Sequence, residues 1–298
     1  MSHIISLISE PVAAAVTPAV VEAVRAAFPV AGETAWLERH VAADLPFTPA
    51  DASALPDLAA LARAAVGDAP VDINIVSANN RRKRLLLADM DSTMIGQECL
   101  DELAAFVGRK AEVAAITERA MRGEIAFEPA LRERVALLRD LRIDVVEQLL
   151  EQGITLTPGG PALVRTMRAH GAHTALVSGG FTVFTGPIAA KIGFQEHRGN
   201  LLEQVRGHFT GTVAEPILGR EAKLAALVDL RGTLGLAPSE TMAVGDGAND
   251  LAMLQEAGLG VAFHAKPAVS AAAHARVDHG DLTALLYLQG YRRDEFVI

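Results

Sequence analysis

The stretch LLLADMDST, at residues 85–93, places two carboxylates directly behind a hydrophobic run. Asp89 and Asp91 are separated by one residue, and side chains at positions i and i+2 of an extended chain face the same way. Two negative charges this close repel each other unless something positive lies between them. The spacing therefore indicates a site that binds a cation or a cationic group.

A second acidic turn has the same design. The sequence GDGAND, at residues 245–250, follows another apolar run and contributes Asp246 and Asp250. If the two runs are neighbouring strands, up to four carboxylates converge at the carboxyl edge of the sheet, where open α/β folds bind ligands. Carboxylate oxygens in a tight glycine-rich turn suit Mg²⁺. A lone D-x-D is weak evidence, but the two turns together are a strong signal.

Two further features suit a phosphate group. The triplet SGG, at residues 178–180, ends a third apolar run and offers the Ser178 hydroxyl and exposed backbone N–H groups. Lys223, in GREAK, precedes GDGAND and could neutralise the same phosphoryl group. A lone lysine on a helix is usually solvent-facing, but the position of Lys223 between the other motifs favours a functional role.

The elements that position these residues show the pattern of a parallel sheet. Short apolar runs separated by helical segments are typical of strands buried on both faces and covered by helices. The runs are LLLA (85–88), HTALVS (173–178), TMAVG (241–245) and LGVAF (259–263). Residues 96–153 are long, charged and helix-like, which predicts an inserted helical cap at about this range. Residues 198–218 alternate around Arg206-Gly207, which predicts a hairpin.

The first quarter of the chain has a different pattern. It predicts three strands and two helices in the order β-α-β-α-β, with strands at 3–9, 34–42 and 71–78 and helices at 18–28 and 53–66. We expect a small α+β domain over residues 1–80, followed by the main domain over 81–298. The polar, basic stretch SANNRRKR at 77–84 would be the boundary. Residues 44–48 are poor strand candidates because of nearby prolines.

Composition narrows the classes of protein. A chain of 298 residues suggests about two domains, and 50% hydrophobic with 21% charged residues predicts a globular protein. The net charge of −9 argues against nucleic-acid binding. We expect no membrane span and no signal peptide. The single cysteine, Cys99, fits a reducing compartment, so we expect a cytoplasmic protein.

The motifs DMDST, SGG, Lys223 and GDGAND, in this order, resemble the four motifs of the haloacid dehalogenase superfamily of phosphatases. The segments MDSTMIGQECLDELA (90–104) and MRGEIAFEPALRERVALL (121–138) resemble the phosphoserine-hydrolysing branch of that superfamily. The resemblance covers residues 85 to about 290 and implies a Rossmann-like core with a helical cap. The N-terminal quarter resembles ACT-type amino-acid-sensing modules, and its role in dimer contact or in ligand sensing stays open.

The resemblance implies a role for each motif residue. Asp89 would be the nucleophile that forms an aspartyl-phosphate, and Asp91 would be the general acid and then the base. The cofactor would be Mg²⁺, held by Asp89, the backbone carbonyl of Asp91 and Asp246, with Asp250 orienting these ligands. The phosphoryl oxygens would be bound by Ser178, the Gly179 amide and Lys223, with support from Asn249.

The cap would select the substrate. By the same resemblance, Glu98 would accept the ammonium group of phosphoserine, Arg134 would bind its carboxylate, and Met121 and Phe127 would close over it. Without the resemblance, Arg134 could equally be a surface charge, and Met121 and Phe127 could be core residues.

The expected reaction is hydrolysis of O-phospho-L-serine to L-serine and phosphate, the last step of serine biosynthesis. Three alternatives stay open. The chain could hydrolyse another small phosphomonoester, transfer phosphate to an alcohol such as homoserine, or be an amino-acid-binding regulatory protein. A homodimer is one arrangement that the N-terminal domain could support.

Overall fold

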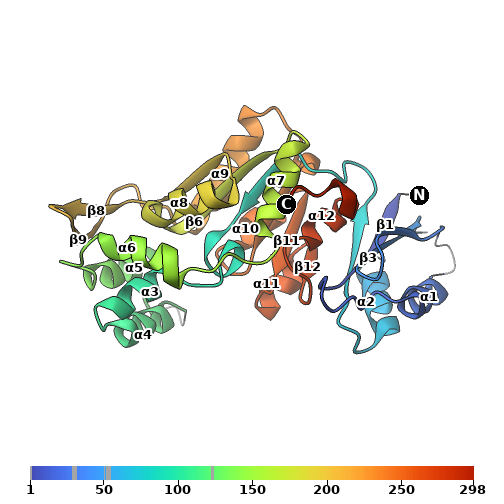
Figure 1. The fold of residues 1–298 in the computed structure, drawn as a ribbon, viewed down its shortest axis with the longest axis horizontal. Coiled ribbons are helices and arrows are strands. Elements are labelled where there is room, and N and C mark those ends of the chain that lie inside the picture. Colours follow the sequence, from blue (N-terminus) through green and yellow to red (C-terminus); the bar gives the residue numbers. More distant parts are fainter. Residues whose placement is uncertain (1, 29–31, 50, 52–54, 122–123) are drawn as a thin grey trace.

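The computed structural model describes residues 2–28, 32–49, 51, 55–121 and 124–298. Its described residues form a four-stranded sheet, a six-stranded sheet and a two-stranded hairpin. Figure 1 shows the six-stranded sheet near the middle of the molecule, with the N-terminal sheet at one end and a group of helices with the hairpin at the other. The N-terminal sheet and the helical cap are therefore far apart.

The N-terminal sheet is antiparallel and has the strand order β2-β3-β1-β4. Its strands are β1 (His3–Ile8), β2 (Ala35–Glu38), β3 (Ala42–Phe47) and β4 (Asp72–Ser77), and its helices are α1 (Pro18–Ala27) and α2 (Leu55–Val66). The chain order βαββαβ is that of a ferredoxin-like sandwich. The expected α+β fold of this region is confirmed.

One strand of this sheet was missed. The prediction of a single strand over 34–42 is wrong, and so is the view that residues 44–48 are poor strand candidates. His40 adopts a positive φ of 65°, which ends β2, and β3 begins at Ala42. Asp44 is the last β3 residue that pairs with β2, and Pro46 lies beyond it. The N–H that proline lacks is therefore not needed for pairing with β2, so Pro46 is tolerated in the strand.

The six-stranded sheet has the order β12-β11-β10-β5-β6-β7, and every pair in it is parallel. Its strands are β5 (Leu85–Ala88), β6 (His173–Phe181), β7 (Glu196–Asn200), β10 (Thr241–Gly245), β11 (Leu259–Phe263) and β12 (Ala275–Val277). The predicted strands at 85–88, 173–178, 241–245 and 259–263 are confirmed.

Helices cover both faces of this sheet. Alternate strand residues belong to two hydrophobic clusters, with Leu86 and Val244 in one and Leu87 and Ala243 in the other. The first cluster includes residues of α7 (Gly160–Ala169), α8 (Thr182–Ile192) and α12 (Ala284–Leu288); the second includes residues of α9 (Arg220–Thr233), α10 (Leu251–Glu256) and α11 (Pro267–Ala272). This arrangement explains why β5 reads as a continuous apolar run.

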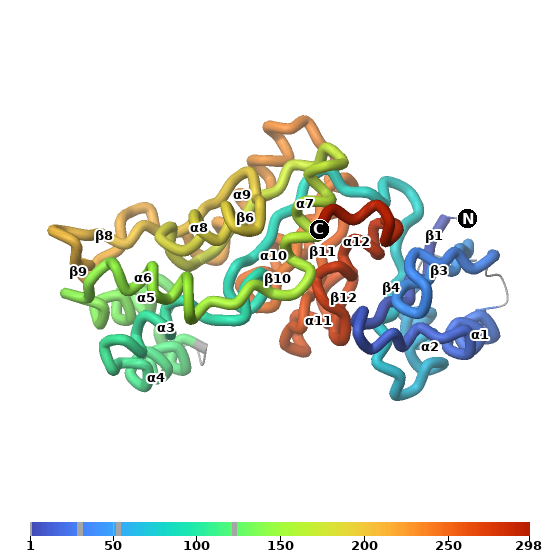
Figure 2. The backbone as a smooth tube through the Cα atoms, in the orientation of Figure 1, coloured from blue at the N-terminus to red at the C-terminus, as the bar shows by residue number. Residues whose placement is uncertain are grey.

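The cap lies between β5 and α7 in the sequence, and Figure 2 shows the chain leaving the core after β5 and returning before α7. It contains α3 (Cys99–Phe106), α4 (Lys110–Met121), α5 (Phe127–Ala136) and α6 (Asp144–Gln148). The predicted hairpin is confirmed as β8 (Leu202–Val205) and β9 (His208–Val213), joined by Arg206 and Gly207 at positive φ. The hairpin packs on α5. The cap therefore has a β component, which lies outside the range of 96–153 predicted for it.

Candidate active site

The register of the parallel strands gathers the acidic turns at one edge of the sheet. Ala88, the last residue of β5, pairs with Val244 of β10 on one side and with Leu176 of β6 on the other. The chain therefore reaches Asp89, Asp246 and Ser178 at neighbouring points of the carboxyl edge. The strand adjacency that the sequence only presupposed is present.

Three carboxylates meet at this edge. Asp89, Asp246 and Asp250 each offer an oxygen within 4.8 Å of the other two. The Lys223 ammonium lies 2.6 Å from Asp89 Oδ1 and 2.7 Å from Asp250 Oδ1. Asp89, Asp250 and Lys223 are nearly inaccessible, at 5%, 0% and 2% exposure, so these charges interact with little screening by solvent.

The charges of this cluster do not balance. Burial and the nearby Asp250 raise the pKa of Asp89 well above its usual value, although Lys223 opposes the shift. Burial alone would lower the pKa of Lys223, but Asp89 and Asp250 outweigh it and raise that pKa. Three carboxylates against one ammonium leave an excess of negative charge. The oxygen donors and this excess fit a divalent cation.

Asp250 differs from the other two carboxylates. Lys223 donates to its Oδ1, and the backbone N–H of Gly247 donates to its Oδ2 over 3.0 Å. Both oxygens already have partners, so Asp250 is suited to hold Lys223 and the GDGAND turn in place. A side chain at Gly245 is excluded there, because its Cβ would lie 2.4 Å from the Asp250 carboxyl carbon.

The Asp91 carboxylate is held by two donors. It accepts from the backbone N–H of Cys99 at Oδ1 over 3.0 Å and from the Ser178 hydroxyl at Oδ2 over 3.3 Å. Burial raises the pKa of Asp91, and the hydrogen bonds from Cys99 and Ser178 oppose that shift. A raised pKa favours the protonated carboxyl, which is the form that a general acid requires.

A tight loop over Met90–Met94 carries Asp91. Asp91 is extended, Ser92 has a positive φ of 55°, and the Ile95 N–H donates back to the Met90 carbonyl. The buried Thr93 hydroxyl donates to Asp246 Oδ1 over 3.2 Å, which ties the loop to the GDGAND turn. Thr93 therefore positions the Asp91 loop relative to Asp246.

The SGG segment lies opposite Asp91. The Gly180 N–H donates to the Ser178 hydroxyl over 2.8 Å, and a Cβ at Gly180 would approach Asp91 Oδ2 to 3.0 Å. Asn200 is buried and donates to the carbonyls of Gly179 and Leu218 over 2.8 and 3.1 Å. Asn200 was not predicted, because β7, with the sequence EHRGN, is polar and carries no apolar run that would mark its end as part of the site.

A cavity of about 450 Å³ separates this edge from the cap. The structure brings most of the predicted residues to its walls, and Lys223 and Asp250 lie buried beside it. The lining members of the predicted set are Asp89, Asp91, Glu98, Phe127, Arg134, Ser178, Gly179, Asp246 and Asn249. Met121 ends α4, and its side chain lies outside the part of the chain that the structure describes.

The cap side of the cavity carries one acid and one base from the predicted set. Glu98 accepts from the Ser92 hydroxyl over 2.7 Å, and partial burial together with Asp91 raises the pKa of Glu98 to about 7. Arg134 donates to the Ala130 carbonyl and the Thr117 hydroxyl over 3.2 and 3.3 Å. Burial lowers the pKa of Arg134, and nearby acids oppose that shift.

Phe127 also lines the cavity, together with several residues that were not predicted. Phe127 is 39% exposed, and its ring lies 3.7 Å from the position that a Cβ of Gly179 would occupy. Lys266 and Asp101 also line the cavity and were not predicted. Lys266 follows the carboxyl end of β11, and its N–H donates to the Asp246 carbonyl over 3.4 Å. Its position behind a core strand was the signal that could have found it.

This combination of a parallel sheet, acidic turns at its carboxyl edge and an inserted cap defines a class of phosphoester-processing hydrolases. The sequence model of the haloacid dehalogenase-like hydrolase family matches residues 86–255. The chain belongs to this family.

The chain is also similar to individual members of this family. The chain is 44% identical over 227 residues to a phosphoserine phosphatase of Streptomyces coelicolor, which covers 76% of this chain and 55% of the relative. It is 45% identical over 210 residues to a phosphoserine phosphatase of Polaromonas sp., which covers 69% of this chain and 89% of the relative. The matched region thus spans about half of the first relative and most of the second.

A solved structure resembles nearly the whole chain. The crystal structure of HAD family hydrolase t0658 from Salmonella enterica serovar Typhi matches with a TM-score of 0.84 and 29% identity. The match covers 96% of this chain and 97% of that one, so it includes the N-terminal sheet as well as the core and the cap. Within the described residues, no helix has the length and apolar character needed to cross a membrane.

Proposed function

We propose that the chain hydrolyses O-phospho-L-serine to L-serine and phosphate, which is the last step of serine biosynthesis. The observation that carries the proposal is the single cavity in which Asp89, Asp91 and Ser178 face Glu98 and Arg134 of the cap. The first group suits a phosphate monoester, and the second suits the ammonium and carboxylate groups of an amino acid. The names of the two relatives point to the same substrate.

In this proposal Asp89 attacks the phosphorus atom and forms an aspartyl-phosphate, while the bond from phosphorus to the serine oxygen breaks. The Met90 N–H and Lys223 both donate to Asp89 Oδ1, which holds the carboxylate in one orientation. Asp91 protonates the departing serine oxygen. It then takes a proton from a water molecule, which attacks phosphorus; the bond from phosphorus to Asp89 breaks, and phosphate and the free Asp89 carboxylate are released.

The phosphoryl oxygens would be bound by Ser178, the Gly179 amide and Lys223, with Asn249 beside them. We propose Mg²⁺ as the cofactor, held by Asp89, the Asp91 carbonyl and Asp246 and oriented through Asp250. When bound, it would neutralise charge on the transferring phosphoryl group. The three converging carboxylates support a hard divalent cation.

Glu98 would accept the substrate ammonium, Arg134 would bind the substrate carboxylate, and Phe127 would shield the phosphoester from water. We assign Met121 the same shielding role by resemblance alone. Residues 1–80 would form a separate domain for dimer contact or ligand sensing, and residues 81–298 would form the phosphatase domain. A cytoplasmic location is part of the proposal, supported by the single, buried and free Cys99.

A phosphate-release panel tests the substrate. O-phospho-L-serine is compared with phosphoethanolamine, which lacks the carboxylate, and with glycerol 3-phosphate, which lacks both the carboxylate and the ammonium group. Each is assayed with Mg²⁺ and after chelation by EDTA, and products formed with added homoserine are analysed for transferred phosphate. We expect Mg²⁺-dependent release with a clear preference for phosphoserine. A preference for either truncated substrate, or transfer exceeding hydrolysis, would contradict the proposal.

A further inference from the structure

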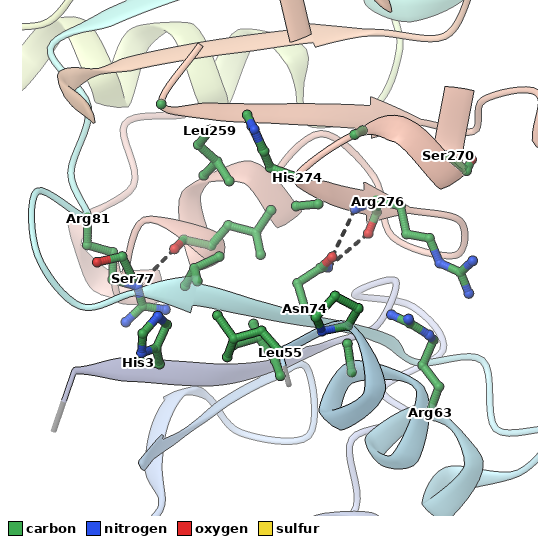
Figure 3. Close-up of a pocket in the computed structure, with 18 of the residues that line it drawn as sticks. His3, Leu55, Arg63, Asn74, Ser77, Arg81, Leu259, Ser270, His274 and Arg276 are labelled. Carbon is green, nitrogen blue, oxygen red and sulfur yellow. Dashed lines mark hydrogen bonds between the residues drawn. The ribbon is translucent and has the colours of Figure 1, made fainter. Parts of the chain in front are cut away.

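A second cleft lies between the N-terminal sheet and the edge of the core, away from the catalytic cavity. It has a volume of about 520 Å³ and shares no lining residue with that cavity among the residues described. Figure 3 shows α2 and β4 on one side of it and the strands that carry Leu259 and Arg276 on the other. The proposed hydrolysis makes no use of this cleft.

The charged side chains of this cleft all have one sign. Its titratable lining residues are basic or imidazole groups, and within the described chain none of the lining side chains is a carboxylate. The basic and imidazole residues are His3, Arg63, Arg81, Lys83, His274 and Arg276. The whole chain has a net charge of −9, so this concentration of positive charge runs against the overall composition.

Two arginines face each other at one end of the cleft. Figure 3 shows Arg63, which comes from α2, and Arg276, which comes from β12, on opposite walls with their guanidinium groups at the same end. Burial and the nearby charge of Arg276 lower the pKa of Arg63, and Asp278 opposes that shift. The positive charges are thus close enough to disfavour each other, and an anion between them would relieve the repulsion.

Neither arginine is fully committed to other partners. Arg63 Nη1 donates to the Ile73 carbonyl over 3.3 Å, and Arg276 Nε lies 3.0 Å from Asp278 Oδ2. A guanidinium carries five N–H donors, so these contacts leave donors on each side chain for a ligand. Arg81 has fewer free donors, because it donates to the Asp44 carboxylate and to two backbone carbonyls over distances of 2.5 to 3.0 Å.

His274 and Lys83 add donors to the walls. The Gly260 N–H donates to His274 Nδ1 over 3.0 Å, so neutral His274 carries its proton on Nε2. Lys83 is only 7% exposed, and its ammonium donates to the carbonyls of Asn80 and Ser239 over 2.7 Å each. Burial lowers the pKa of Lys83 to about 8. Its two partners are neutral, so its charge is not neutralised by them.

The walls of the cleft are held at a fixed separation. Asn74 of β4 exchanges two hydrogen bonds of 2.9 Å each with the backbone N–H and carbonyl of Arg276. The buried Asp72 accepts from the backbone N–H groups of Asp278, His279 and Gly280. These bonds join the N-terminal sheet to the edge strand β12, so the donors on the two walls are pre-organised.

We propose that this cleft is a binding site for a small organic anion, whose carboxylate or phosphoryl group lies between Arg63 and Arg276. The volume lies within the range of roughly 300–1,000 Å³ that is typical of ligand pockets. Leu55, Ile75 and Leu259 give the remaining wall an apolar character that suits the carbon frame of such a ligand. A ligand there would contact both domains at once.

Isothermal titration calorimetry with the full-length protein tests the site. One probe is tricarballylate, a polycarboxylate, and the other is phenylphosphonate, which has a phosphoryl group and no cleavable ester. They distinguish a carboxylate from a phosphoryl ligand. The test variant is R63Q/R276Q, and the matched control is R142Q, because Arg142 makes the same type of local pair with Asp144 on the exposed cap surface.

We expect at least one probe to bind the wild type and R142Q equally, and R63Q/R276Q at least roughly tenfold more weakly. One charge-assisted hydrogen bond is worth about that factor. Phosphoserine hydrolysis by R63Q/R276Q should match the wild type, which shows that the variant is folded. Binding that is unchanged in R63Q/R276Q, as would occur at the catalytic cavity, overturns the proposal. So does the absence of binding of both probes to the wild type.

Discussion

Replacing Lys223 by methionine should destabilise the protein strongly and impair catalysis. The ammonium group is almost completely buried and lies 2.6 and 2.7 Å from two carboxylates. Methionine keeps much of the volume but removes the charge, so Asp89 and Asp250 are left buried and uncompensated. Breaking a buried ion pair from one side costs about 3–5 kcal/mol in the free energy of unfolding.

This cost converts into a measurable shift. At roughly 2–4 °C per kcal/mol for a domain of about this size, the melting temperature of K223M should fall by roughly 6–20 °C at neutral pH. The turnover number should fall by about 10²–10³-fold, which is typical for loss of one group that stabilises transition-state charge. Scanning fluorimetry without Mg²⁺ and a phosphate-release assay with Mg²⁺ measure the two effects.

The pH dependence has a definite sign. Without Lys223, which opposes the shift, the folded-state pKa of Asp89 should lie further above its unfolded value. A carboxyl with a raised folded-state pKa destabilises the fold as pH rises above its unfolded pKa, and this effect disappears on acidification. The difference in melting temperature between K223M and the wild type should therefore shrink as the pH is lowered from 7 towards 5.

Two variants provide controls. K110M removes an exposed lysine that lies 3.5 Å from Glu102, and such surface pairs contribute about 0–1 kcal/mol, so its melting temperature should hardly change. The double variant K223M/D250N removes one of the two unpaired carboxylates and should recover part of the lost stability. If K223M melts together with the wild type at pH 7, the buried charge cluster does not have the energetics inferred from its geometry.

Four further predictions follow from the same site. D89N should abolish turnover and aspartyl-phosphate formation while circular dichroism stays unchanged, because an amide is a poor nucleophile; near-normal phosphate release would remove Asp89 from the mechanism. R134A should raise KM for phosphoserine far more than for phosphoethanolamine, by roughly tenfold or more for loss of a charge-assisted pair, and equal losses would show that Arg134 does not bind the carboxylate. Since the pKa of Glu98 is raised to about 7, kcat/KM for phosphoserine should increase as pH rises through 7, and E98Q should remove this step; an identical profile in E98Q would exclude Glu98. A truncated chain beginning at Asn79 should stay active and Mg²⁺-dependent but melt at a lower temperature, and a folded yet inactive product would show that the N-terminal domain shapes the active site.

Much of the candidate site was predictable from local patterns. Asp89, Ser178 and Asp246 each follow an apolar run, and the carboxyl ends of parallel strands meet at one edge of a sheet. The order of strands β10-β5-β6 was not predictable in the same way, because the apolar runs do not indicate which strands are neighbours. Strand order depends on how the long crossover connections pack against the sheet, and short-range periodicity does not encode this packing.

Local propensity misjudged β3. Residues 44–48 contain a proline and an aspartate, both of which are poor strand formers. In the structure Asp44 is buried and paired with Arg81, and β3 is held between β1 and β2. Tertiary contacts outweighed propensity there, because pairing with two strands and a buried ion pair contribute more than the intrinsic preference of a few residues.

The sequence by itself therefore determined which residues stand at the strand ends, and with them the acidic site, the core and the existence of a cap. Only the tertiary structure decided the partners of side chains that are distant along the chain. Asn74 bonds to Arg276 across 202 positions, and Arg63 faces Arg276 over a basic cleft that no motif marks. Periodicity reports which face of an element is buried, whereas contacts between elements depend on how their surfaces fit together in space.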